Sequence, residues 1–99
     1  MAYTERIPMI TLATTLALDP RVRFRRFEDE GIVINQKTAE ALVISEVGTR
    51  LLEIADGTRT LDECAALLTE EFDADRDTIA ADVLQFANEL VDAGVAAAR

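Results

Sequence analysis

The sequence TLDECAALLTEEFDADRDTIAADVLQFANELVDAG, residues 60–94, decides the fold because it encodes two consecutive helices joined by a short acidic link. Thr60 followed by Glu63 forms a capping box, in which each side chain satisfies a free backbone N–H of the other residue. Apolar residues then recur at helical spacing. Asp75 is expected to cap the second helix, and Gly94 is expected to end it.

A shorter helix is expected immediately before this pair. Val47 and Leu51 fall on one helical face, and Ser45 can cap the first turn. Gly57 is well placed to stop the helix in a left-handed conformation. Gly48 lies inside this helix, where glycine costs up to about 1 kcal/mol relative to alanine. We therefore expect another backbone to approach Gly48 closely.

Three short strands are expected upstream of the helices, over residues 22–27, 32–34 and 40–45. They are rich in β-branched and aromatic residues and are separated by short polar connections, which favours an antiparallel meander. Three strands followed by three helices predict an α+β domain, in which a sheet is attached to a helix-turn-helix group.

Residues 1–20 read as a Thr- and Ala-rich N-terminal arm, and residues 21–99 as the folded domain. The arm can be flexible, add a strand, or fill a groove of its own or a neighbouring copy. Its apolar part, residues 7–18, lacks the basic flank and cleavage site of a secretory signal, so we expect a cytoplasmic protein. No apolar run approaches the ~20 residues that span a bilayer, and no membrane association is expected.

The composition excludes several classes of function. The chain has no histidine and one cysteine, Cys64, so it lacks the commonest general base and any intramolecular disulfide or Cys-based metal site. We expect Cys64 to be a small core residue. The formal net charge of −9 argues against a nucleic-acid partner, because phosphate binding requires clustered Lys and Arg. A non-catalytic binding role without metal or cofactor is therefore expected.

The helix expected from residue 76 onward carries more apolar surface than one core contact requires. Its apolar residues span an arc of roughly 160°, wider than the ~100° stripe of an ordinary surface helix. Either the other elements cover both parts of this surface, or the alanine-bearing flank lines a groove for a peptide lying against a sheet edge. The two parts are Ile79, Val83, Phe86 and Leu90, and beside them Ala80, Leu84, Ala87 and Val91, with Arg76 along the same flank.

Residues 46–95 resemble the PqqD-like family, and the strands of residues 22–45 fit the sheet of that family. The resemblance lies in Asp56-Gly57 with Thr58-Arg59-Thr60, in Phe72-Asp73, and in Leu90 followed by Gly94. It implies a winged helix-turn-helix with a three-stranded antiparallel sheet followed by three helices, also called a RiPP recognition element. Such domains bind the leader of a ribosomally synthesised precursor peptide and present it to a modifying enzyme, such as a radical SAM protein or a cyclase.

The resemblance also implies where a leader peptide binds. In the family, the leader adds as a strand to the third strand of the sheet and lies against the third helix. The residues at the matching positions of this chain are Glu40, Ala41, Leu42, Val43, Ile44, Ser45, Arg76, Ala80, Val83, Leu84, Ala87 and Val91.

Four points stay open. A winged helix can bind DNA, although four acidic residues on the third helix oppose it, and the domain can be a general protein-interaction module. A homodimer can form by exchange of a strand or of the arm. A basic patch is either the solvated face of an edge strand or a docking site for an acidic leader segment or the enzyme; its residues are Arg21, Arg23, Arg25 and Arg26.

Overall fold

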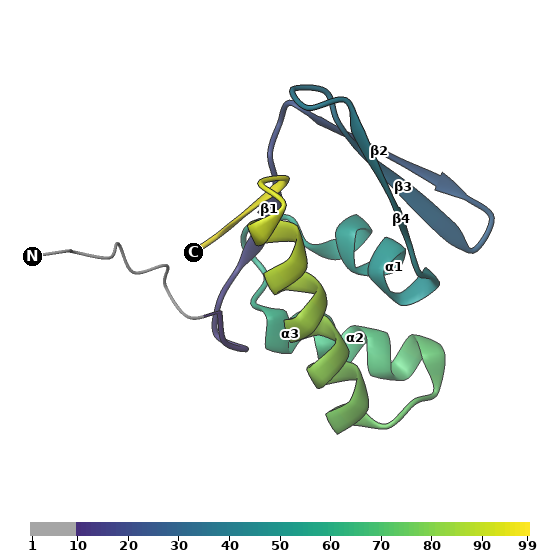
Figure 1. Ribbon diagram of the computed structural model, residues 1–99. Helices are drawn as coiled ribbons and strands as arrows, with labels where there is room; N and C mark the ends of the chain where they lie inside the picture. The colour runs from purple at the N-terminus through teal and green to yellow at the C-terminus, as the bar shows by residue number, and fades with distance from the viewer. Residues whose placement is uncertain (1–9) are drawn as a thin grey trace, which may run out of the picture.

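The computed structural model describes residues 10–99 and has a sheet and three helices packed around one core (Figure 1). The predicted α+β arrangement of a three-stranded antiparallel sheet followed by three helices is confirmed. A small two-stranded sheet of β1 and β5 is added to it. The elements are β1 (Leu16–Leu18), β2 (Val22–Phe27), β3 (Glu30–Asn35), β4 (Glu40–Ile44), α1 (Glu46–Ile54), α2 (Leu61–Phe72), α3 (Arg76–Asp92) and β5 (Ala96–Ala98).

The three-stranded sheet has the order β2-β3-β4, so β4 lies at an edge. Successive side chains of a strand alternate between the faces of the sheet. Val33 and Ile44 are buried on the face that carries α1, whereas Val43 is 68% exposed on the other face. A Cβ on Gly31 would lie 2.6 Å from the Thr49 Oγ1 atom, so this glycine allows α1 to pack closely on the sheet.

The predicted caps of α2 and α3 are confirmed. The Thr60 Oγ1 atom accepts the Glu63 backbone N–H at 3.1 Å, and the Glu63 carboxylate accepts the Thr60 N–H at 2.8 Å. The Asp75 carboxylate accepts the Thr78 N–H at 3.1 Å at the start of α3. These bonds satisfy backbone donors that have no partner within the helix.

Ser45 caps α1 as expected, and β4 ends one residue before the end of the predicted strand. The Ser45 Oγ atom accepts the Gly48 N–H at 3.2 Å. A Cβ on Gly48 would lie 2.9 Å from the Cζ atom of Phe86, which comes from α3. The expected close approach of another backbone is therefore corrected: the neighbour that requires a glycine here is an aromatic ring.

Both glycines that were expected to end helices have a left-handed backbone. Gly94 follows α3 with φ of 76°, and Gly57 follows α1 with φ of 85°. Helix α1 ends at Ile54, before Gly57, and the Gly57 N–H donates to the Leu16 carbonyl at 3.1 Å. Gly57 therefore turns the chain after α1 and also holds β1 in place.

The described part of the N-terminal arm packs into the core. Leu16 is fully buried, and β1 pairs with β5 in the register Leu16↔Ala98. The Thr14 carbonyl accepts the N–H of Leu61 at 2.8 Å, so the arm also contacts the start of α2. Residues 16–18 thus add a strand, whereas residues 1–9 lie outside the described part of the chain.

Helix α3 is covered along much of its apolar surface. Its core residues Ile79, Val83 and Leu90 are almost fully buried. The alanine-bearing flank also belongs to the packing, because Ala87 is fully buried and the remaining residues are partly buried against the core; these are Ala80, Leu84 and Val91.

We expect Leu16→Ala to lower the free energy of unfolding by about 2–5 kcal/mol, because truncating a buried leucine removes contacts and leaves a cavity. Urea denaturation followed by circular dichroism measures this change. Val43→Ala is the control on an exposed strand position, where the change should stay within about 0.5 kcal/mol. Equal stability of the Leu16→Ala and parent proteins would contradict the placement of the arm in the core.

We expect the effect of Gly48→Ala on stability to depend on Phe86. In a Phe86→Ala background, Gly48→Ala should stabilise the protein by about 0.5–1 kcal/mol, because alanine is the better helix former and no ring opposes its Cβ. With Phe86 present, the ring must move, and the gain should vanish or change sign. A double-mutant cycle of unfolding free energies tests this. The same effect in both backgrounds would refute the contact.

Candidate functional site

Strand β4 offers a free edge for another chain. Among the described strands it pairs only with β3, so the backbone N–H and C=O groups along its other side have no strand partner there. The neighbouring side chains are open to solvent, with Leu42 38% and Val43 68% exposed. Such an edge can accept an added strand through backbone hydrogen bonds.

A hollow of about 540 Å³ lies beside this edge, between β4 and α3. A second hollow of about 360 Å³ continues between α1 and α3, and the two share Ser45, Phe86 and Glu89. We call the pair the β4–α3 groove. Its first part is lined by Leu42, Val43, Ile44, Ser45, Phe86, Glu89, Leu90 and Ala93, and its second by Ser45, Val47, Gly48, Leu51, Asp82, Val83, Gln85, Phe86 and Glu89.

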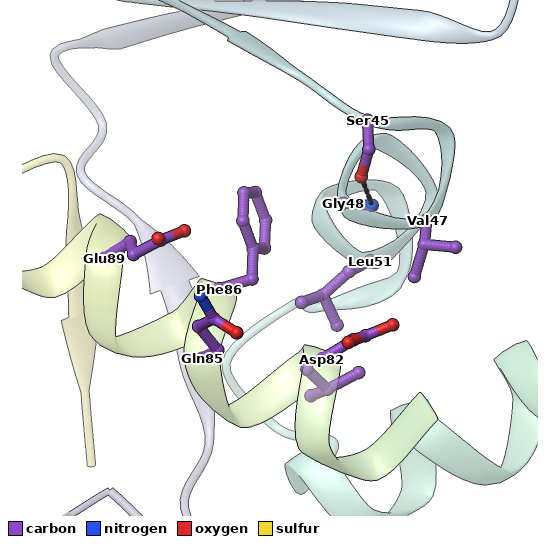
Figure 2. A pocket seen from close by; sticks show the side chains of 9 residues that line it. Ser45, Val47, Gly48, Leu51, Asp82, Gln85, Phe86 and Glu89 are labelled. Carbon is purple, nitrogen blue, oxygen red and sulfur yellow. Dashed lines mark hydrogen bonds between the residues drawn. The ribbon is translucent and has the colours of Figure 1, made fainter. Parts of the chain in front are cut away.

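One side of α3 forms the wall of the groove (Figure 2). Asp82, Phe86 and Glu89 follow one another at helical spacing, and they leave α3 toward α1 in Figure 2. The Phe86 ring reaches Gly48, so the absence of a side chain at Gly48 leaves room for the ring. On the α1 side, Val47 completes the apolar lining.

The structure brings only some of the sequence-predicted site residues together. From the strand side, Leu42, Val43, Ile44 and Ser45 line the groove, and Glu40 and Ala41 are exposed earlier on β4. From α3, Val83 lines the part next to α1. The other predicted α3 residues do not line it: Ala87 is fully buried, Arg76 donates to Asp62 of α2 at 2.6 Å, and Ala80, Leu84 and Val91 pack against the core.

Apart from Val83, the residues of α3 and of its C-terminal cap that line the groove were not among the predicted site residues; they are Asp82, Gln85, Phe86, Glu89, Leu90 and Ala93. The apolar arc of α3 has two edges, and the prediction assigned the groove to the edge with the alanines. Phe86 lies at the opposite edge, with carboxylates one turn away on each side. An aromatic residue between two acidic residues, at the edge of the apolar arc, was the signal available in the sequence.

The groove is acidic and carries no cation among the described residues that line it. Its charged side chains are Asp82 and Glu89. The basic patch lies elsewhere. Arg21 pairs with Asp19 at 2.9 Å, and Arg26 pairs with Glu53 at 2.9 Å. Arg23 and Arg25 lie opposite Ile34 and Ile32 of β3, on the face of the sheet that points away from α1.

The remaining candidate groups have structural roles. Cys64 is fully buried, as expected for a core residue, and burial raises the pKa of its thiol. Glu71 lies next to Arg50, whose hydrogen bonds lower the pKa of the Glu71 carboxyl.

Over residues 10–99, no helix has the length and apolar character needed to cross a bilayer. The arrangement of the groove suits the binding of an extended chain.

The sequence was compared with family models and with curated proteins, and both comparisons give a match. The sequence model of the family described as coenzyme PQQ synthesis protein D (PqqD) matches residues 30–96. The PqqA binding protein of Rhizobium meliloti (strain 1021) is 30% identical over 87 residues, which cover 88% of this chain and 89% of that protein.

Two solved structures share the fold, each with a TM-score of 0.71. TbiB1, solved in complex with the TbiA(β) leader peptide, is 19% identical, and the match covers 81% of this chain and 93% of TbiB1. The PqqD truncation of Methylobacterium extorquens PqqCD, a RiPP recognition element, is 23% identical, and the match covers 83% of this chain and 87% of that one. With the family match over residues 30–96 and a curated relative at 30% identity over most of both chains, this chain belongs to the PqqD family.

Proposed function

We propose that this chain binds the leader of a ribosomally synthesised precursor peptide and presents the peptide to a modifying enzyme, such as a radical SAM protein or a cyclase. The leader adds as a strand to β4. The observation that carries this proposal is the free edge of β4 beside the β4–α3 groove. Backbone hydrogen bonds to the edge supply affinity, and the groove supplies selectivity through alternate side chains.

The alternation of β4 decides which leader side chains enter the groove. Ile44 is buried toward α1, and Leu42 lies two residues before it on the same face. Val43 and Ala41 lie on the opposite face. An added strand continues this alternation, so every second leader side chain faces α3 and the others face solvent beside Val43.

The relatives support a binding role. One is named for binding PqqA, and TbiB1 was solved with a leader peptide on the same fold. The described residues of the groove hold no cysteine, and its one hydroxyl, that of Ser45, caps α1. A DNA-binding role is opposed by charge, because the exposed side of α3 carries Asp77, Asp82, Glu89 and Asp92.

We expect backbone N-methylation of the leader to separate its two sets of amides. In an antiparallel or parallel pair, only alternate residues of a strand donate to the neighbour. Two synthetic leaders are therefore compared, one N-methylated at the odd positions of the bound segment and the other at the even positions. One of them should lose at least tenfold in affinity, and the other should bind almost as tightly as the unmethylated peptide. The probe is the PqqA peptide, which the relative from Rhizobium meliloti is named for binding, and its affinity is measured by fluorescence anisotropy. Equal losses would contradict strand addition.

We expect Ala93→Trp to weaken leader binding at least tenfold, because the indole would fill the groove end beside Leu90. Ala81→Trp is the matched control, since Ala81 is exposed on α3 but does not line the groove. Its affinity should stay within about twofold of the parent. Isothermal titration with the same leader measures both variants, and circular dichroism confirms that they fold. An unchanged affinity of Ala93→Trp would show that the leader binds elsewhere.

A further inference from the structure

We infer that the β4–α3 groove selects leader segments by charge. The preferred segment carries an apolar side chain facing the groove and, two residues away, a lysine or arginine facing the same way. This inference rests on the proposed function and adds the chemical class of the ligand.

The charge of the groove comes from two carboxylates on one side of α3. Asp82 and Glu89 lie about one turn before and after Phe86, and all three line the groove. Neither carboxylate belongs to an ion pair within residues 10–99, where the paired acids are Asp19, Glu53, Asp56, Asp62 and Glu71. The two charges are thus available to a ligand.

The cations within residues 10–99 do not offset this charge. No lysine or arginine is among the described residues that line the groove. Arg23 and Arg25 lie on the face of the sheet that turns away from α1, in register with Ile34 and Ile32. A leader acid facing the groove would therefore meet two carboxylates without a compensating charge, and a leader cation would be attracted by both.

The apolar part of the groove lies next to the two carboxylates. Leu42 and Ile44 on the strand side face Phe86, Leu90 and Ala93 across the first hollow. Side chains on one face of a strand repeat every ~6.7 Å, and one helical turn rises ~5.4 Å. Glu89 lines both hollows together with Phe86, so an added strand that places one apolar side chain over Phe86 brings a neighbouring side chain on the same face within reach of the Glu89 carboxylate.

The test uses the full chain and a display library of random 12-residue peptides. Selected peptides should carry lysine or arginine two positions from an aliphatic or aromatic residue far more often than aspartate or glutamate. Replacing that cation by glutamate in a selected peptide should lower the affinity roughly fivefold to twentyfold at low salt, because attraction by two exposed carboxylates becomes repulsion. The difference should shrink in 1 M NaCl, where the Debye length falls to ~3 Å.

Two double variants separate the groove from the acidity of the whole chain. In D82K/E89K the preference should reverse, so that the glutamate peptide binds better. E70K/D92K changes the net charge by the same amount at exposed positions outside the groove, and it should keep the preference for the cation. If both variants lose the preference equally, the general acidity of the chain explains it and the inference is overturned.

The remaining outcomes distinguish this inference from the proposed function. Peptides whose binding is abolished by Ala93→Trp, but which show no preference for a cation, would overturn the charge selection and leave the peptide-binding role standing. Selected peptides that bind equally well to Ala93→Trp would overturn both, because binding would then not use the groove.

Discussion

Strand β4 passes into helix α1 through a single residue, Ser45, and the geometry of the site depends on this junction. The backbone of Ser45 is extended, with φ of −69° and ψ of 171°, while its hydroxyl already accepts the Gly48 N–H. With no loop between them, the edge strand and the helix cannot move independently. The two walls that β4 and α1 present to α3 are therefore fixed together, and one groove runs along both.

Helix α3 completes the groove because its apolar residues serve two purposes. Ile79, Val83 and Leu90 hold the helix in the core, and this packing fixes the direction of the side chains next to them. Phe86 lies at the margin of the core, where it fills the space left by Gly48 and also faces the groove. The same ring thus belongs to the α1–α3 contact and to the binding surface, so changes in one affect the other.

Local signals in the sequence predicted most of the fold. The caps at Thr60 and Asp75 and the glycine after α3 depend on nearest neighbours along the chain, so they can be recognised without tertiary information. The alternating strands were recognised for the same reason. Strand β5 was missed, because its sequence, AAA, has no strand preference, and it becomes a strand only by pairing with β1.

The residues on the strand side of the groove were predicted, but of the α3 residues that line it only Val83 was. The apolar arc of α3 is wider than one contact with the core requires, which indicates a second contact along the helix. The arc has two edges, however, and the sequence does not say which edge faces β4. The packing of Ala87 and the ion pair of Arg76 with α2 settle the direction of the helix. Both depend on contacts between distant segments, which one sequence does not display.

The pairing of β1 with β5 has a consequence for the order in which this protein forms. Thr15 and Arg99 are 84 positions apart and exchange backbone hydrogen bonds of 2.9 Å. During synthesis, Leu16 emerges from the ribosome early, but the strand that pairs with it emerges only after all three helices. Closing so long a loop is slow compared with local helix formation. The sheet and helices can therefore assemble before the two distant segments join.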